Sequence, residues 1–311
     1  MNIPTLHRPL YDGCTTGEEK AAAMTAAMTE LQEVNDDGMD FSNKTSMAIA
    51  YERHVESQRD DRLFHDPLAV HLYEPYGQKM SDALAFGLAY SIFDPPGADI
   101  GIGMMGHTLY TAARTKFINT HLESWLGTAT TGDKQVVNLG AGADTRVFWL
   151  DCLEGASIYW EVDQASVMTW KQTILNGLDE KELVKPKCTY KCISMDFNKE
   201  SVADLPKHGF DSKIPTCWIL EGLIMYLPRT ETEQLFDYIS QLSAPGSYLI
   251  LNFASSDKLG PTIDEIDERL TASSWTKESR LMFGEEGFNF GRYPSDKPAN
   301  KLMGFGLYQK K

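Results

Sequence analysis

Residues 136–150 read VVNLGAGADTRVFWL, and this stretch decides the fold. An apolar run ends in Gly140-Ala141-Gly142, and apolar residues at helical spacing follow it. A Gly-x-Gly turn between a strand and a helix lets the backbone approach a ligand, because glycine has no Cβ. A nucleotide is the first candidate ligand. The dinucleotide-binding fingerprint, however, would need a third glycine where this chain has Thr145.

The chain changes character after Gly132. Five β-rich runs follow, QVVNLG, SIYWEVD, TYKCISMD, TCWILEG and GSYLILNF, and segments of helical length lie between them at roughly 143–151, 164–178 and 230–242. Alternation of this kind predicts an α/β fold with a mostly parallel, twisted sheet and helices on both faces.

The first third of the chain is predicted to be helical. From Ser42 to Leu126 apolar residues recur mostly at intervals of three and four, interrupted by DPLAVHLYEPYG and FDPPGADIGIG. The segment EEKAAAMTAAMTELQEV has helical composition and is expected to be loosely held. We therefore expect a helical cap over residues 1–132 and a core over 133–311, together forming one integrated domain.

Polar residues stand at the predicted strand ends, where ligands bind in open α/β sheets. After the glycine loop come Glu161 and Asp163 at the second strand, Asp196 at the third, and Glu221 with Gly222 at the fourth. An acid 23 residues after Gly140 suits hydrogen bonds from both hydroxyls of a ribose. An acid at the third strand end could accept a hydrogen bond from an adenine amino group.

Composition excludes several function classes. The formal charge is −15, with 44 acids against 29 bases, which disfavours binding to nucleic acid. No apolar run approaches the length of a membrane span, so we expect a cytoplasmic protein without a membrane partner. The five cysteines are scattered, and Cys188 and Cys192 are the only close pair, so neither disulfides nor a metal site is expected.

The residues resemble the leucine carboxyl methyltransferase-like family of S-adenosylmethionine-dependent O-methyltransferases. The resemblance runs from about Thr45 to Phe253. It is carried by TSMAIAYERHVESQRDDRLFHDPLA, TAARTKFINTHL, VVNLGAGADTRVFWL, YWEVDQASVMTWKQTIL and CWILEGLIMYLPRTETEQLFDYISQLSAPGSYLI. It implies a Rossmann-like class I methyltransferase fold and S-adenosyl-L-methionine as the cofactor.

The resemblance also implies roles for individual residues. Arg114 would bind the cofactor carboxylate through its planar fork, and Arg53 stands near the place where protein-methylating members use a lysine for this carboxylate. Glu221 would bind the amino group. By the same resemblance, Gly140 and Gly142 would lie near the methionine and ribose portions of the cofactor, Asp163 would bind the ribose hydroxyls, and Asp196 and Phe197 would bind the adenine. The remaining implied cofactor-binding residues are Ala141, Gln164 and Gly222.

Candidates on the acceptor side are fewer. Tyr226 follows Glu221 by five residues and is the predicted positioning residue of the catalytic site. A carboxylate acceptor needs no base, whereas a hydroxyl acceptor does. The candidate bases are His107, beside a GIGMMG segment that could form a lid, His121 and His208. The acceptor pocket could be lined by apolar side chains, for which the candidates are Met104, Met105, Phe148 and Trp149.

Several functions stay open at the level of the sequence. The leading one is methyl transfer to an oxygen of a small molecule, with no partner protein. The alternative within the family is methylation of a protein C-terminal carboxylate. A nicotinamide-dependent oxidoreductase and a non-catalytic cofactor-binding protein are the alternatives outside methyl transfer.

Overall fold

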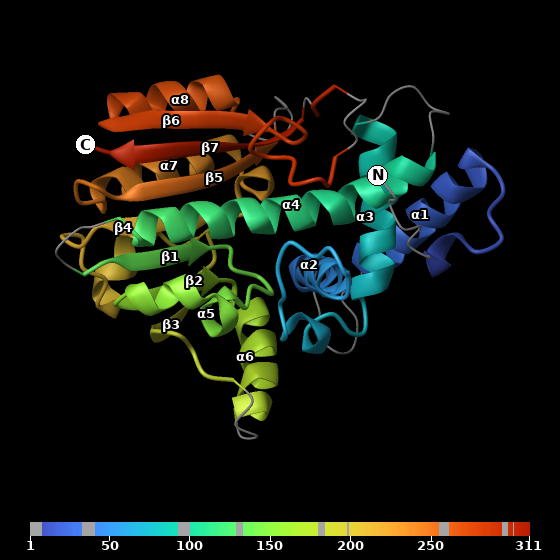
Figure 1. The fold of residues 1–311 in the computed structure, drawn as a ribbon, viewed down its shortest axis with the longest axis horizontal. Coiled ribbons are helices and arrows are strands. Elements are labelled where there is room, and N and C mark those ends of the chain that lie inside the picture. Colours follow the sequence, from blue (N-terminus) through green and yellow to red (C-terminus); the bar gives the residue numbers. More distant parts are fainter. Residues whose placement is uncertain are drawn as a thin grey trace.

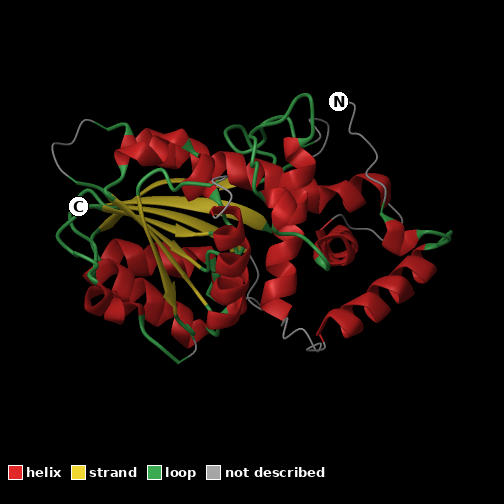
Figure 2. Ribbon diagram, turned by 90° about the horizontal axis from the view of Figure 1, so that it is seen from below, coloured by secondary structure: helices red, strands yellow, loops and turns green. Residues whose placement is uncertain are grey.

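A computed structural model describes residues 8–32, 41–92, 100–128, 133–179, 184–197, 199–254, 261–293, 298–300 and 302–311, and for residues 86–92 and 100–106 it describes the backbone alone. The fold is a sheet covered on both faces by helices, with a group of helices at one end (Figures 1 and 2). Within the described ranges, no helix is long and apolar enough to cross a bilayer.

The sheet has seven strands in the order β3-β2-β1-β4-β5-β7-β6. The five strands on the β3 side are parallel, β7 runs antiparallel to β5, and β6 runs antiparallel to β7. The strands are β1 (Gln135–Leu139), β2 (Ile158–Asp163), β3 (Thr189–Ser194), β4 (Thr216–Leu220), β5 (Tyr248–Ala254), β6 (Trp275–Met282) and β7 (Met303–Lys310). The predicted five strands and their parallel pairing are confirmed.

Eight α-helices fall within the described part of the chain: α1 (Gly17–Gln32), α2 (Phe41–Ser57), α3 (Gly77–Ile92), α4 (Ile100–Leu126), α5 (Arg146–Trp149), α6 (Ala165–Asp179), α7 (Arg229–Gln241) and α8 (Ile263–Ala272). Five short 3-10 turns connect them: η1 (Pro9–Tyr11), η2 (Ala69–His71), η3 (Asp151–Gly155), η4 (Val202–His208) and η5 (Ile224–Tyr226). The helix predicted at 143–151 is thus the short α5 followed by η3.

Every residue of β1, β4 and β5 is buried, because each of these central strands is covered on both faces. One face packs against α7 and α8, with Trp218 of β4 in that cluster. The other face packs against the C-terminal half of α4, where Phe117 and Leu122 contact the sheet layer. Helix α4 therefore belongs both to the sheet layer and, through its N-terminal half, to the helical group at the end of the molecule (Figure 1).

One expectation about the helical third was wrong. The GIGMMG segment, expected to interrupt the helical pattern, lies within α4, because packing against α3 overrides the low helix propensity of glycine. Its possible role as a lid and the loose attachment of α1 stay predictions; α1 packs against α3 and buries Ala27 and Leu31. The side chains of Met104 and Met105 lie outside the described residues.

Beyond about Asp257 the sequence matches no recognisable motif. In the structure, this region forms α8 and the antiparallel pair β6 and β7, which extends the sheet beyond β5. The acidic run DEIDERL lies in α8, which buries Ile263, Ile266 and Leu270 and carries its charges on the other side.

Candidate active site

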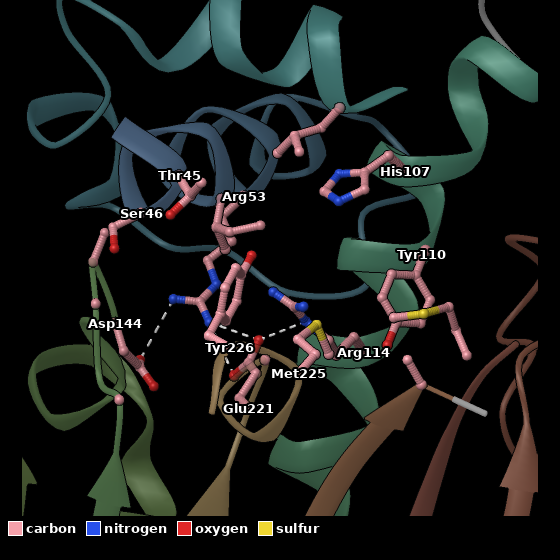
Figure 3. Close-up of a pocket in the computed structure, with 18 of the residues that line it drawn as sticks. Thr45, Ser46, Arg53, His107, Tyr110, Arg114, Asp144, Glu221, Met225 and Tyr226 are labelled. Carbon is pink, nitrogen blue, oxygen red and sulfur yellow. Dashed lines mark hydrogen bonds and ion pairs between the residues drawn. The ribbon is translucent and has the colours of Figure 1, made fainter. Parts of the chain in front are cut away.

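A cavity of about 540 Å³ opens where the loops after β1 and β4 meet the helical cap. The two strands are neighbours in the sheet although they are some 80 residues apart in the chain, so their loops lie side by side. Figure 3 shows side chains from both loops and from α2 and α4 pointing into one space. This is the point at which the chain order of the strands reverses, where α/β sheets bind their ligands.

The floor of the cavity is a buried cluster of charges. Glu221 is contacted by three guanidiniums: Arg114 Nε lies 2.8 Å from Oε1, Arg53 Nη2 lies 3.2 Å from Oε1, and Arg146 Nη1 lies 2.8 Å from Oε2. Asp144 pairs with Arg146 and lies 3.6 Å from Arg53 Nη1. Three guanidiniums thus face two carboxylates, and the buried carboxyl group of Asp66 also interacts with Arg53.

The electrostatics of this cluster favour ionised carboxylates. Burial alone would raise the pKa of Glu221, but Arg146, Arg53 and Arg114 together hold that pKa well below its ordinary value. The pKa of Asp144 is also lowered, since the attraction of Arg146 and Arg53 outweighs the effect of burial. Both carboxylates are therefore negative at neutral pH.

The glycine loop leaves no room for side chains. Gly140 and Gly142 have φ angles of 68° and 50°, in the left-handed region that favours glycine. A Cβ on Gly140 would lie 3.0 Å from Leu223 Cδ1, and one on Gly142 would lie 2.9 Å from Ser46 Oγ. The backbone of this loop consequently forms part of the cavity wall itself.

The other half of the cavity is mostly apolar. Its lining comes partly from the helical cap, with Met24, Met28, Ile49, Ala83 and Leu84, and partly from η5 and the ends of β5 and β7, with Met225, Ala254, Leu302 and Met303. Tyr226 also lines the cavity and is 59% exposed, which places it at the mouth. The cavity therefore has a charged end at the β1 and β4 loops and an apolar end lined by the cap together with the ends of β5 and β7.

Eight of the predicted site residues line this cavity: Arg53, Arg114, Gly140, Ala141, Gly142, Glu221, Gly222 and Tyr226. Four others do not: Asp163, Gln164, Asp196 and Phe197. Asp163 lies directly behind the loop, where Oδ2 accepts a hydrogen bond of 2.7 Å from the backbone N–H of Gly142 and Oδ1 accepts one from the N–H of Gln164. Its proposed role toward ribose stays a prediction.

The third strand end lies apart from the cavity. Asp196 forms an ion pair of 2.7 Å with Lys199, and Phe197 lines a separate depression of about 190 Å³ between η4 and α7. The structure thus brings the first and fourth strand ends together at one cavity. The assignment of the third strand end to adenine also stays a prediction.

Of the other candidates on the acceptor side, only one that the structure describes lines the cavity. His107 lines the cavity, whereas His121 lies outside the lining and packs at a tilt against Phe117, with ring centroids 4.3 Å apart. His208 ends the exposed turn η4. Phe148 and Trp149 are packed elsewhere: Phe148 contacts Tyr190 edge to face, and Trp149 stacks on Phe64.

Sequence reasoning missed two parts of the site. Asp144 and Arg146, from the triplet Asp-Thr-Arg after the glycine loop, complete the charge cluster beneath Glu221. Glu52, in the helix of Arg53, is fully buried and binds His107. A signal for Glu52 was available, since a carboxylate next to an arginine inside an apolar helical stripe is costly to bury unless it has partners.

In the described ranges, no three side chains of His, Cys, Asp or Glu gather in a way that could hold a metal ion. Cys192 is exposed on the edge strand β3, and Cys188 precedes that strand. The pair therefore forms no part of the cavity.

The fold and site together define a doubly wound α/β protein with a nucleotide-type loop and a helical cap over its ligand cavity. Comparison with known proteins narrows this class. The sequence profile described as leucine carboxyl methyltransferase matches residues 46–240. The chain belongs to the leucine carboxyl methyltransferase family.

Its relatives include bacterial proteins named as S-adenosyl-L-methionine-dependent methyltransferases. One from Mycobacteroides abscessus is 33% identical over 260 residues, which is 81% of this chain and 77% of the relative. One from Parafrankia sp. is 33% identical over 232 residues, or 73% of this chain and 69% of the relative.

Solved structures agree at the level of the fold. A DUF574 family protein from Streptomyces avermitilis aligns with a TM-score of 0.50 at 11% identity, covering 86% of this chain and 97% of that one. With the family established, the observed seven-stranded, mostly parallel sheet is a Rossmann-like class I methyltransferase fold, as the sequence predicted.

Proposed function

We propose that this protein transfers a methyl group from S-adenosyl-L-methionine to an oxygen atom of a small-molecule acceptor. The family and the names of its relatives support the cofactor and the methyl transfer. The choice of acceptor is an inference from the shape and chemistry of the cavity.

The observation that carries the proposal is the charge cluster at the strand loops. The amino-acid end of the cofactor has a carboxylate and an ammonium group. The guanidiniums of Arg53, Arg114 and Arg146 suit the carboxylate, while Glu221 offers acceptor oxygens to the ammonium. Arg114 and Glu221 both line the cavity, so the charged atoms of this pair lie where the amino-acid end of the cofactor would bind.

The glycine loop fits the rest of the cofactor. Its backbone forms the cavity wall, and Asp163 fixes the loop through the N–H of Gly142. When bound, the cofactor supplies an electrophilic methyl group on a sulfonium ion. The residues of the cavity hold the acceptor in line with that methyl group and exclude water, and positioning of this sort can account for about 7–11 kcal/mol of a barrier in the best cases.

The apolar end of the cavity supports a small acceptor. The methionines Met24 and Met28 of α1 roof it, so the space beyond the charge cluster is bounded by protein on the side of the cap. Flexible methionine side chains adapt to the shape of an apolar molecule. The alternative, methylation of a protein C-terminal carboxylate, would need an extended chain to enter the same bounded space.

A transfer experiment separates these acceptors. The protein is incubated with methyl-labelled cofactor and a cell extract that is then divided into small-molecule and protein fractions. We expect the label in the small-molecule fraction. Label confined to the protein fraction, and released by mild base as expected of a methyl ester, would favour the protein carboxyl alternative instead.

A further inference from the structure

A buried carboxylate lies behind the apolar end of the cavity. Glu52 of α2 is fully buried, and its two oxygens accept hydrogen bonds from Ser81 at 2.7 Å, from Thr111 at 2.6 Å and from His107 Nδ1 at 2.7 and 2.8 Å. Burial alone would raise the pKa of Glu52, but His107 and the two hydroxyl donors reverse this and lower it. Glu52 is therefore ionised at neutral pH, and both of its oxygens face Nδ1 of His107.

This contact fixes the orientation of the imidazole. In the neutral imidazole, a carboxylate held against Nδ1 selects the tautomer in which Nδ1 carries the proton, so that Nε2 has the free electron pair. Among the residues that the structure describes, Nε2 has no hydrogen-bond partner, and His107 lines the cavity. Figure 3 shows the ring pointing from α4 into the same space as Arg114 and Tyr226.

Helix α4 sets the distance between the two ends of the site. His107, Tyr110 and Arg114 stand at helical positions i, i+3 and i+7, and all three line the cavity. Arg114 belongs to the charge cluster, and His107 lies two turns away, about 10 Å along the axis, beside the apolar lining. One helix thus presents a cofactor-binding arginine and a free imidazole nitrogen to a single cavity.

We propose that His107 is the general base of the reaction and that the acceptor is an apolar molecule carrying a hydroxyl group, an alcohol or a phenol. This rests on the methyl transfer proposed above. The acceptor oxygen forms a bond to the methyl carbon, the carbon–sulfur bond breaks with its electron pair left on sulfur, and the hydroxyl proton moves to Nε2 of His107 and then to solvent. Glu52 is the positioning residue that holds the imidazole.

Other ionisable groups act on the same pair. Asp82 of α3 interacts with Glu52 and is itself held by Arg8, whose Nη1 lies 2.9 Å from Oδ1. Arg114 of α4 and Tyr51 of α2 also interact electrostatically with Glu52. These groups are common to the parent and the variants below, so differences in pH dependence report on His107 and Glu52.

The first test uses His107→Gln, with His121→Gln as a matched control from the same helix but outside the cavity. Calorimetric titration with S-adenosylmethionine is done first. If the parent binds no cofactor, the proposed function fails as a whole, and this inference fails with it.

The acceptors for the rate measurements are a simple phenol, a nitrophenol that is ionised at the assay pH, and benzoate. We expect His107→Gln to bind cofactor like the parent but to lose about 10²- to 10⁴-fold in kcat for the phenol, with only a few-fold loss for the nitrophenol. The inference would be overturned by equal losses of kcat for the phenol and the nitrophenol, by no loss of kcat for the phenol, or by methyl transfer to benzoate alone.

A second test observes the His107 imidazole directly by NMR. In ¹⁵N-labelled, cofactor-free protein, the imidazole signals of His107 are identified by their absence in His107→Gln. We expect the tautomer with the proton on Nδ1, and we expect Glu52→Gln to abolish that preference and shift the acidic limb of the pH–rate profile. The opposite tautomer in the parent, with the proton on Nε2, would overturn the inference whether or not any acceptor is methylated.

Discussion

At the scale of single residues, Arg114 links the two halves of the site. It stands on α4, which packs against the sheet, and its guanidinium contacts Glu221 after β4 at 2.8 Å. An arginine in this position presents a planar pair of donors to a carboxylate, whereas lysine presents a single charged point. We therefore expect Arg114 to contribute to cofactor binding through the geometry of its guanidinium as well as through its charge.

We expect Arg114→Ala to weaken cofactor binding by about 1.5–3 kcal/mol, since it removes a charge-assisted contact, and Arg114→Lys to weaken it by less. Calorimetric titration measures both. The control is Arg229→Lys, on the exposed side of α7, which should bind like the parent. Parent-like affinity in both Arg114 variants would remove this residue from the cofactor site.

Asp163 allows a second residue-scale prediction. It is expected to accept from the ribose hydroxyls, and it already accepts from the N–H of Gly142. Asp163→Ala should therefore weaken cofactor binding by about 2–3 kcal/mol through lost charge-assisted bonds. Asp163→Asn keeps one acceptor and should fall in between. An unchanged dissociation constant in Asp163→Ala would show that the acid serves the loop alone.

At the scale of elements, the turn between β1 and α5 tests why glycine is needed. Gly140 and Gly246 both have positive φ angles, 68° and 83°, but only Gly140 has a neighbour within reach of an added Cβ, Leu223 Cδ1 at 3.0 Å. Left-handed backbone costs a side-chain-bearing residue about 1–2 kcal/mol. We expect Gly246→Ala to lose that amount of unfolding free energy and Gly140→Ala to lose more, as measured by urea denaturation. Equal losses of unfolding free energy in the two variants would mean that the β1–α5 loop accommodates the added Cβ without steric strain.

The elements also show which parts of the fold a sequence can reveal. The parallel strands were predictable because strands buried on both faces read as largely apolar runs, as in Cys217–Leu220 and, interrupted only by Asn138, in Val136–Leu139. The edge strand β6, with the sequence WTKESRLM, alternates too weakly, since much of it is exposed. The start of α4 was missed because glycines at 101, 103 and 106 mark a loop by propensity, while packing on α3 decides otherwise.

The candidate site was predictable to a similar degree. Strand-end residues such as Glu221 could be placed together, because the carboxyl ends of parallel strands share one edge of a sheet. The pairing of Glu52 with His107 could not, since it depends on how α2 and α4 cross, and no local pattern encodes that crossing.

At the scale of the whole molecule, the buried cluster ties the cap to the sheet: Arg53 comes from α2, Arg114 from α4, and Glu221 from the end of β4. Such a cluster makes the stability of the whole chain depend on pH. The pKa of Glu221 is lowered from 4.5 in the folded state, so its contribution is present above that value and is lost as the pH falls toward the folded pKa.

We therefore expect the urea midpoint of the parent to fall more steeply between about pH 5 and pH 3 than that of Glu221→Gln, which has no proton to take up at this position. Glu231→Gln, a change of a half-buried carboxylate outside the cluster, in the first turn of α7, is the control and should follow the parent. Parallel slopes for parent and Glu221→Gln would show that Glu221 contributes nothing to acid sensitivity.

The central claim is that the cavity between the β1 and β4 loops binds S-adenosylmethionine through its amino-acid end. The most direct measurement is a calorimetric titration of the purified chain with S-adenosylmethionine, with its demethylated product and with NAD. We expect a dissociation constant in the micromolar range or below for S-adenosylmethionine and for its demethylated product, and no heat of binding for NAD. Binding of NAD without binding of S-adenosylmethionine would contradict it.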